Sequence, residues 1–452
     1  MSVFDGKRLD PAVFRVDAER MRQGWYSDGY FLNIAKLLGA LAAEGYRFAG
    51  TSDLPEATDD VPTGDIEVEM QIFTRRSPFT VVAGVDEALA ILWACTGHFD
   101  QAGVWHATAT RLAVDAVQDG ILLSYEGDPR RVLPVLRIRG RYRDFAILET
   151  PILGALTEPS RIATNVYQVL QATRGKDVLF FPARFRHYKL QAMDGYAYAL
   201  AVQAYNARYG GHSNIFVSTD EQAAWWGGRG TGTVAHSAIA CFFGDTAETM
   251  VQFARVIPPD VRRIALVDFH NDCVAESLAV AARLFKRYRQ AVDAGESDAD
   301  RYRLFAVRLD TSRSLRDVSV EPTGIRDIDN GVNPRLVFAV RRAIDQAADG
   351  WDLPEAWRER ARQWCREVKI VATGGFNPER IRLFEELAVP VDIYGVGSHL
   401  ASNCEGHGTN NDYTADVVRV RVHGQWLDMA KVGRQPSDNP LLERVAPPPD
   451  VT

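Results

Sequence analysis

The feature that most constrains the fold is a regular alternation, after Asp144, of short apolar runs with amphipathic segments. The apolar runs have the length of buried strands, and the segments between them have helical periodicity. Such alternation over about 250 residues is typical of a (β/α) barrel or a doubly wound parallel sheet. We expect strands at 178–181, 214–217, 264–267, 304–309, 370–372 and 391–394, and helices at 188–208, 235–243, 273–291 and 334–348.

The residues before Asp144 follow a different pattern, typical of an α/β or α+β layer. Residues 66–73 alternate apolar and polar side chains, as a half-buried strand does. The tail, residues 413–432, returns to this alternation, which indicates that it rejoins the first part of the chain. We expect helices at 29–43 and 86–95 and further strands at 79–85 and 132–138.

Composition excludes several classes of protein. Of 452 residues 46% are apolar, which excludes disorder of the whole chain. No apolar run approaches the ~18 residues of a membrane helix, and the first residues lack the pattern of a secretory signal. A net charge of −7 argues against bulk nucleic-acid binding. The five scattered cysteines form no Cys-x-x-Cys pair, so we expect no zinc site and a cytoplasmic protein with reduced thiols.

Two glycine motifs follow predicted strands. Ile370-Val-Ala-Thr-Gly-Gly375 and Val391-Asp-Ile-Tyr-Gly-Val-Gly-Ser398 are one strand–helix unit apart. In (β/α) barrels the loops after the last strands often bind phosphate through backbone N–H groups. Because Gly374, Gly375 and Gly397 have no Cβ, they allow such close approach. The alternative is two tight turns without a ligand; the tandem favours a phosphosugar substrate.

Charged residues also follow predicted strands. Asp268 ends one strand, and Arg308 and Asp310 lie at the end of the next. Carboxylates at this rim suit ribose hydroxyls or Mg²⁺, whereas the alternative is rim salt bridges or helix N-caps. His236, in Gly230-Thr-Gly-Thr-Val-Ala-His-Ser237, is expected near the start of a helix, where it could act as a nucleophile or acid/base group or be structural.

A compact basic and aromatic patch follows the strand at 178–181. Arg184, Arg186 and His187 would suit an aromatic anion, with a ring for stacking and a guanidinium for a carboxylate. The alternative is a solvated positive turn. The chain contains no phosphate-binding P-loop motif, nucleophile elbow or dinucleotide fingerprint.

Together these motifs resemble the nicotinate phosphoribosyltransferase family, whose type II phosphoribosyltransferase fold is related to the nicotinamide and quinolinate enzymes. The resemblance extends from about Tyr26 to Arg434 and rests on the order and spacing of the motifs. They are Ser27-Asp-Gly-Tyr30, Glu149-Thr-Pro-Ile-Leu153, Ile162-Ala-Thr164, Gly210-Gly-His-Ser-Asn214, Gly232-Thr-Val-Ala-His-Ser237, Val267-Asp268, Arg308-Leu-Asp310, Thr373-Gly-Gly375, Gly395-Val-Gly-Ser398 and Ala430-Lys-Val-Gly-Arg434.

The resemblance implies a fold and an assembly. It implies an irregular (β/α) barrel packed with an open-faced α/β sandwich that both chain ends form. The implied division is an N-terminal sandwich domain at 1–143, a barrel at 144–402 and a C-terminal segment at 403–452 that returns to the sandwich. Active sites in the family lie at the interface of a homodimer.

The resemblance also implies roles for individual residues. Tyr30 of a neighbouring subunit and Phe181 would stack on the pyridine ring, with Arg184 alongside. Asp268, Arg308 and Asp310 would hold phosphoribosyl pyrophosphate, accompanied by Mg²⁺. Gly375 and Gly397 would bind its 5′-phosphate, with Gly374, Gly395 and Ser398 in the same substrate-binding set. His236 matches the histidine that ATP phosphorylates, and with Asp268 and Asp310 it forms the expected catalytic group; no metal ligand is assigned.

Ser213 bears on the choice of base. The nicotinamide enzyme has an aspartate at the corresponding place, and a serine there can donate to a carboxylate that an aspartate would repel. The sequence departs from the family at Pro182, Phe185 and Tyr188, which stand where a glycine, a second arginine and a proline are usual. Arg186 could supply the missing cation from another angle.

We therefore expect a cytoplasmic enzyme of NAD salvage that converts nicotinate and phosphoribosyl pyrophosphate, coupled to ATP, to nicotinate mononucleotide and pyrophosphate. The alternative within the class is a phosphoribosyltransferase of the same fold for a different N-heterocyclic acid. A phosphosugar isomerase or aldolase would need a Schiff-base lysine or a carboxylate pair, and the expected barrel strands contain no obvious lysine. A ligand-binding protein that kept the fold is the non-enzymatic alternative.

Overall fold

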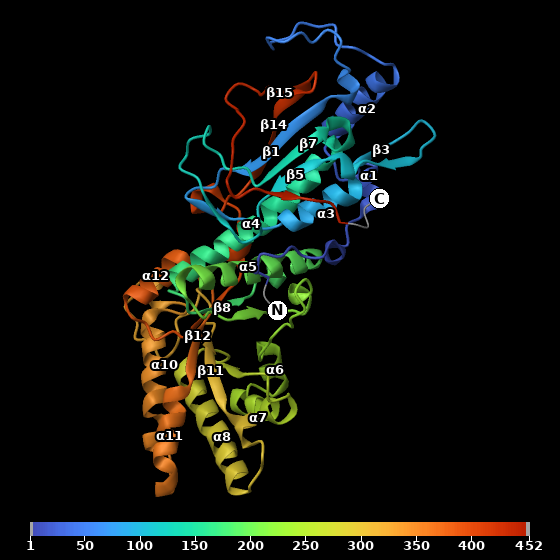
Figure 1. Ribbon diagram of the computed structural model, residues 1–452. Coiled ribbons are helices and arrows are strands. Elements are labelled where there is room, and N and C mark those ends of the chain that lie inside the picture. Colours follow the sequence, from blue (N-terminus) through green and yellow to red (C-terminus); the bar gives the residue numbers. More distant parts are fainter. Residues whose placement is uncertain (1–2, 449–452) are drawn as a thin grey trace.

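The computed structural model describes residues 3–448 and contains two separate six-stranded sheets. An antiparallel sheet and its helices form one end of the molecule, and a parallel sheet with longer helices forms the other (Figure 1). The long helices α4 and α5 cross the middle, between the two sheets. The fold is therefore mixed α/β, with one six-stranded sheet of each kind and two small two-stranded antiparallel sheets.

The parallel sheet confirms all six strands expected after Asp144, with bounds shifted by two residues at most. Its order is β10-β11-β12-β13-β8-β9, and every pair is parallel. This is the cyclic order of a barrel with one open seam, between β9 and β10. The strands are β8 (Asp177–Phe180), β9 (Ile215–Val217), β10 (Arg263–Leu266), β11 (Leu304–Leu309), β12 (Lys369–Ala372) and β13 (Ile393–Val396).

The two faces of the parallel sheet bury different side chains. One small core cluster takes one residue from each of five strands: Leu179, Ile264, Ala306, Val371 and Ile393. Their neighbours in sequence belong to the larger core that the helices cover. Because side chains alternate between the two faces of a strand, the small cluster marks the inner face of a curved sheet.

Helices cover the outer face of the parallel sheet, and the sequence sets where they begin. Asp272 and Asn377 accept hydrogen bonds from backbone N–H groups in the first turns of α8 and α12, as N-caps do. The expected helices are confirmed as α5, α6, α8 and α10. The helices are α4 (Glu149–Ala172), α5 (Gln191–Tyr209), α6 (His236–Cys241), α7 (Thr246–Val256), α8 (Cys273–Asp293), α9 (Arg326–Asp329), α10 (Pro334–Ala347), α11 (Glu355–Glu367) and α12 (Pro378–Glu386).

Both ends of the chain build the antiparallel sheet, so the tail does rejoin the first part of the chain. The sheet has the order β15-β14-β1-β7-β5-β16, and β1 pairs with β14 along most of its length. Its strands are β1 (Glu67–Thr74), β5 (Ala113–Ala116), β7 (Leu136–Arg141), β14 (Tyr413–Val422), β15 (Gln425–Asp428) and β16 (Glu443–Val445).

Smaller elements complete this end of the molecule. The helices expected at 29–43 and 86–95 are confirmed, but two expected strands were too long. The strand at 79–85 ends at Val81 because the chain turns into a helix at Val85, and the strand at 132–138 begins only at Leu136, after Pro134. The elements are α1 (Ala18–Arg22), α2 (Gly29–Ala43), α3 (Val85–Cys95), β2 (Phe79–Val81), β3 (Gly97–Phe99), β4 (Trp105–Ala107) and β6 (Leu122–Ser124).

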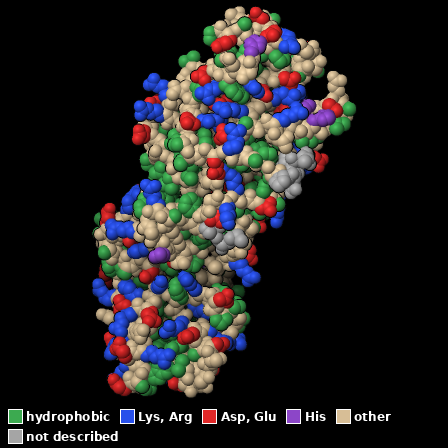
Figure 2. All heavy atoms as spheres, in the orientation of Figure 1, with side chains coloured by type: hydrophobic (Ala, Val, Ile, Leu, Met, Phe, Trp, Pro, Cys, Tyr) green, Lys and Arg blue, Asp and Glu red, His purple; other side chains and the backbone are tan. Residues whose placement is uncertain are grey.

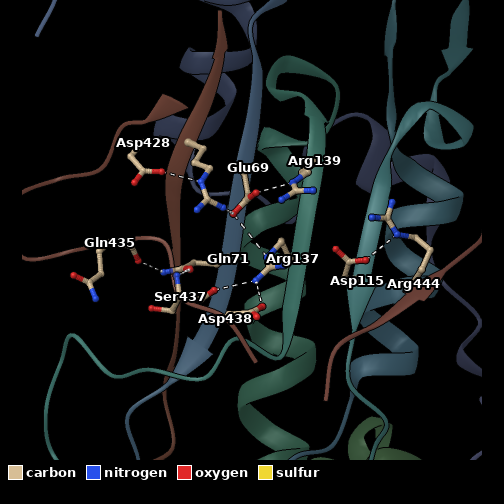
Figure 3. A network of polar contacts seen from close by, with 11 residues as sticks. Glu69, Gln71, Asp115, Arg137, Arg139, Asp428, Gln435, Ser437, Asp438 and Arg444 are labelled. Carbon is tan, nitrogen blue, oxygen red and sulfur yellow. Dashed lines mark hydrogen bonds and ion pairs between the residues drawn. The ribbon is translucent and has the colours of Figure 1, made fainter. Parts of the chain in front are cut away.

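One face of β1 is polar although it is buried. Glu69 is fully buried and accepts hydrogen bonds from Arg139 at 2.6 Å and Arg419 at 2.9 Å, on the strands to either side (Figure 3). Gln71 binds the backbone of Gln435 and Ser437, so the C-terminal segment lies across this face. A buried carboxylate needs such paired partners, and here they connect strands from both chain ends.

The surface is mixed in charge. Acidic and basic side chains are interspersed over the face that Figure 2 shows. Within residues 3–448, no helix is both long and apolar enough to cross a membrane.

A substitution at Gly195 tests how closely α5 packs against the rest of the protein. A Cβ at this position would lie 1.9 Å from the carbonyl oxygen of Gln222. We expect Gly195→Ala to destabilise the protein by about 1–3 kcal/mol through overpacking, measured as a lower thermal unfolding midpoint. Gly154→Ala is the matched control, because a Cβ on this exposed glycine of α4 meets nothing within 4 Å. It should raise stability by about 0.5–1 kcal/mol, and equal effects of the two changes would contradict this account.

Candidate active site at the carboxyl ends of the parallel strands

A cavity of about 430 Å³ opens where the parallel strands end. Because all six strands run in one direction, the residues that follow them meet at one edge of the sheet. Ten predicted residues line the cavity: Phe181, Arg184, His236, Arg308, Asp310, Gly374, Gly375, Gly395, Gly397 and Ser398. The structure thus brings most of the predicted set together, while the role of each remains a prediction.

His236 and Asp268 form a pair at one wall of the cavity. His236 is the first residue of α6, and its Nε2 lies 2.9 Å from Oδ1 of Asp268, which follows β10. The Asp268 side chain is buried behind the half-exposed imidazole. Burial raises the pKa of Asp268, and the hydrogen bond and charge of His236 oppose that shift. Asp268 does not cap α8, since Asp272 does.

Arg308 and Asp310 lie at the end of β11. An Arg308 Nη2 atom is 3.7 Å from Oδ2 of Asp310, and Oδ1 of Asp310 accepts a hydrogen bond of 2.7 Å from the Thr373 hydroxyl. The alternative of a salt bridge at the rim is therefore present, but it leaves a hydrogen-bond donor of Arg308 for a ligand. Nε of Arg308 is buried and has no hydrogen-bond partner among the described residues. Burial also lowers the pKa of Arg308, so an anion would relieve a desolvated cation.

The glycine loop after β12 has a backbone that other residues rarely adopt. Gly374 and Gly375 have φ angles of +93° and +71°. Among the described residues, the N–H groups of Gly374, Gly375 and Phe376 have no acceptor. Three adjacent unpaired N–H groups beside a cavity are a ready binding site for an anion.

An aromatic surface forms the opposite side of the cavity. A Cβ on Gly395 would lie 3.0 Å from the Phe181 ring, so this ring lies directly against the glycine. The Phe185 ring lies as closely against Gly397. The Arg184 guanidinium is 5.4 Å from the centroid of the Phe185 ring, within cation–π range, and remains exposed. The Arg308 guanidinium lies 5.9 Å from the centroid of the Phe181 ring. The patch therefore offers a flat apolar surface with the exposed guanidinium of Arg184 beside it.

Arg186 cannot supply the second cation that the family usually has. Its Nε donates to Asp194 at 3.1 Å and its Nη2 to Glu158 at 2.8 Å, so the side chain is half-buried in a network between α4 and α5. Pro182 fits its place because it begins the turn with φ −78° and its carbonyl accepts from the Phe185 N–H.

The prediction that Ser213 contacts the base is wrong for this structure. Ser213 precedes β9, and its buried hydroxyl donates to the carbonyl oxygen of Gly175, which precedes β8. It therefore lies at the amino ends of the strands, opposite the cavity. Ser218, directly after β9, lines the cavity instead. Sequence reasoning missed it, although its place after a predicted strand was a usable signal.

Tyr30 does not reach the cavity of its own chain. It lies on α2, at the end of the molecule with the antiparallel sheet, and its side chain is 57% exposed. Its hydroxyl donates to Asp28 at 3.4 Å. Tyr30 is therefore exposed and takes no part in the cavity of its own chain.

Three further residues that sequence reasoning did not assign also line the cavity. They are Ala183, Ala235 and Phe376. Thr373, quoted above only as part of a motif, lines it as well and fixes Asp310 by a hydrogen bond. Each follows a predicted strand or begins a predicted helix, but only the fold brings them to one place.

Comparisons with known proteins agree with this geometry. A family model described as the N-terminal domain of quinolinate phosphoribosyl transferase matches residues 56–160. Nicotinate phosphoribosyltransferase pncB2 of Mycobacterium tuberculosis is 25% identical over 269 residues, which cover 59% of this chain and 44% of that protein. The match thus spans less than half the length of the curated relative.

Solved structures show the same fold over nearly the whole chain. The nicotinate-nucleotide pyrophosphorylase from Pyrococcus furiosus has a TM-score of 0.60 and 26% identity, covering 93% of this chain and 80% of that one. Human nicotinic acid phosphoribosyltransferase has a TM-score of 0.57 and 16% identity, covering 89% and 75%. These findings show that the chain has the fold of the type II phosphoribosyltransferases. The resemblance to nicotinate phosphoribosyltransferases is also confirmed, because a curated relative has that name.

Proposed function

We propose that the chain is a nicotinate phosphoribosyltransferase that joins nicotinate to phosphoribosyl pyrophosphate with the help of ATP. The observation that carries this proposal is the single cavity that collects an aromatic surface, a free guanidinium, a half-buried arginine–carboxylate pair and unpaired loop N–H groups. Each group suits a different part of the two substrates. We propose that the enzyme acts in the cytoplasm. All five cysteines are free thiols, which suits a reducing compartment.

The base would bind at the aromatic side of the cavity. The Phe181 ring offers one face for stacking, and Arg184 offers a charge for the carboxylate. Since Arg186 is paired elsewhere, Arg184 is the exposed guanidinium of this patch and would bind the carboxylate of nicotinate. The Arg308 guanidinium, 5.9 Å from the Phe181 ring centroid, lies on the side of the donor's leaving group in this proposal.

The donor would bind along the strand ends. The loop N–H groups of Gly375 and Phe376, with Gly397 and Ser398 opposite, would hold the 5′-phosphate. The described residues contain no group of three or more His, Cys, Asp and Glu side chains that could hold a metal ion. Mg²⁺ would therefore arrive with the phosphates, beside the partly exposed Asp310, and would neutralise charge on the departing pyrophosphate.

The proposed reaction needs no general base. The pyridine nitrogen attacks the anomeric carbon with its own lone pair, the new N–C bond forms, and the bond to pyrophosphate breaks. The residues of the chain would act by holding ring, ribose and phosphates in line and by stabilising charge. Arg308, a buried cation with a free Nε, is suited to the developing negative charge of the leaving group.

His236 would couple the reaction to ATP. If Nε2 donates to the buried carboxylate of Asp268, the other ring nitrogen, Nδ1, keeps its lone pair and can accept a phosphoryl group. Asp268 would then fix the tautomer and stabilise the phosphorylated ring. The half-exposed position of His236 at the cavity wall supports access for ATP.

The proposed domain division is a sandwich at 1–143, an irregular barrel at 144–402 and a C-terminal segment at 403–452. The shared antiparallel sheet and the start of α4 at Glu149 support these boundaries.

A homodimer with shared active sites is part of the proposal. Its support is the exposure of Tyr30, Tyr26 and Trp25, three aromatic side chains near the start of α2.

A phosphoribosyltransferase for a different N-heterocyclic acid is the second candidate. It is favoured by Phe185, which lines the cavity where the family usually has a second arginine. The first experiment therefore compares bases in one assay.

We expect pyrophosphate release from phosphoribosyl pyrophosphate and Mg²⁺ to depend on nicotinate and to increase with ATP. Nicotinamide should be a poor substrate, because Arg184 has no carboxylate to bind. Arg184→Ala should raise the KM for nicotinate about tenfold or more, as loss of a charged hydrogen bond does. The KM of Arg184→Lys should lie between those of the wild type and Arg184→Ala. The KM for phosphoribosyl pyrophosphate is the internal control. Release with another heterocyclic acid but not nicotinate would select the second candidate.

His236→Ala should abolish both phosphohistidine formation and ATP stimulation, and leave a slower uncoupled transfer. Phosphohistidine formation is measured directly by labelling with γ-³²P-ATP and by release of the bound label in acid. The matched control is His270→Ala, an exposed histidine hydrogen-bonded to Glu276 that does not line the cavity. Unchanged ATP coupling in His236→Ala would remove its assigned role.

Tyr30→Ala should weaken the binding of nicotinate by about 1–3 kcal/mol, by analogy with base stacking. The binding of phosphoribosyl pyrophosphate should be weakened less. If a neighbour supplies Tyr30, mixing Tyr30→Ala and Arg308→Ala chains should restore activity at a low nicotinate concentration, since some sites then combine two intact halves. Absence of any rescue in a mixture that contains heterodimers would contradict a shared site.

A further inference from the structure

Behind the glycine loop, and outside the lining of the cavity, lies the side chain of Arg380. Its Nη1 donates to the carbonyl oxygens of Gly374 at 2.7 Å and Gly375 at 3.4 Å. Its Nη2 donates to the carbonyl oxygen of Val332 at 2.5 Å. One guanidinium thus joins the loop after β12 to the segment that precedes α10.

These contacts set the direction of the loop's amide groups. A peptide unit is planar and trans, so its carbonyl oxygen and its amide hydrogen point in opposite directions. The carbonyls of Gly374 and Gly375 face Arg380, so the N–H groups of the next residues, Gly375 and Phe376, face away from it. Those N–H groups have no acceptor among the described residues, and both residues line the cavity.

We propose that Arg380 is a positioning residue for substrate phosphate: by binding the outer carbonyls of Gly374 and Gly375 it holds the N–H groups of Gly375 and Phe376 toward the cavity. The inference rests on the proposed function for the identity of the substrate. It assigns a role in phosphate binding to a side chain that never touches the phosphate.

The side chain is held firmly enough for this task. Arg380 lies in the first turn of α12, and its backbone N–H donates to the N-cap, Asn377. The guanidinium lies 4.4 Å from the ring centroid of Phe376 and 5.8 Å from that of Phe384. Burial and the nearby Arg313 lower the pKa of Arg380 to about 10, so it is still charged at neutral pH.

The loop depends on this guanidinium more than on its neighbour. Arg313 also donates to the Gly375 carbonyl, but it is exposed and bonds no other carbonyl among the described residues. Without Arg380 the Gly374 carbonyl loses its partner, and glycine peptides with positive φ turn easily. A turned peptide would present a carbonyl oxygen to the cavity and repel a phosphate.

The test compares Arg380→Met and Arg380→Lys with Arg382→Met. Arg382 lies two residues further on the same helix, has a side chain that is 53% exposed and, within residues 3–448, pairs only with Glu379. Inorganic phosphate is the direct probe, titrated by calorimetry, and the KM values for phosphoribosyl pyrophosphate and nicotinate are measured in parallel. Thermal unfolding midpoints report any general loss of structure.

We expect Arg380→Met to raise the Kd for phosphate and the KM for phosphoribosyl pyrophosphate about tenfold or more, as loss of a charged hydrogen bond does. The KM for nicotinate should change less than about twofold, since its site lies against Phe181 and Arg184. Arg380→Lys should give an intermediate loss, because an ammonium cannot reproduce the planar fork. Arg382→Met should match the wild type in all three constants.

Two results would overturn the inference: unchanged phosphate affinity in Arg380→Met, or equal losses for phosphate and nicotinate alongside a lower unfolding midpoint. If Arg380→Met does not fold, Arg380→Lys decides by the same comparison. Wild-type chain that binds phosphate but transfers no ribosyl group would reject the proposed function and leave the Arg380 comparison valid. Wild-type chain that binds no phosphate would overturn both.

Discussion

Parallel pairing of six strands is the constraint on which the candidate site depends. Hydrogen bonds between β8 and β13 and along β10 to β13 fix one direction for all strands, so every carboxyl end opens on the same cavity. The side chains that follow β8, β10, β11, β12 and β13 come from positions more than two hundred residues apart in sequence. No local interaction could assemble them, and the cluster of Leu179, Ile264, Ala306, Val371 and Ile393 inside the sheet holds the strands in place.

The antiparallel sheet has the complementary task of joining the two chain ends. Its inner face is an ordinary apolar core, but its outer face depends on the buried Glu69 between Arg139 and Arg419. Such a buried ion set gives little net stability, whereas removal of one partner leaves an unpaired buried charge. The pairing therefore selects one arrangement, with β14 beside β1.

The sequence predicted well what depends on periodicity and on residues next to strand ends. All six parallel strands and the loops of Gly375 and Gly397 were predicted, because a buried strand and a glycine turn leave local signals. Ser213 was misplaced because its role came from the resemblance of a motif, whereas the predicted strand at 214–217 already put it before the amino end of that strand. Arg380 was missed for a different reason: on a helix it has the pattern of an ordinary charged residue, and its partners are backbone carbonyls that no sequence pattern reveals.

The chemistry proposed for the cavity makes such hidden residues important. A pyridine nitrogen needs no base, so the rate depends on the alignment of ring, ribose and phosphates and on charges fixed in advance. Fixed charges and dipoles must themselves be held: Asp268 holds His236, Thr373 holds Asp310, and Arg380 holds the amides of the glycine loop. Backbone N–H groups are neutral and cannot be recognised by residue type. In the proposed site, selectivity for phosphate therefore lies partly in the residues that turn the peptide groups, one layer behind those that would meet the substrate.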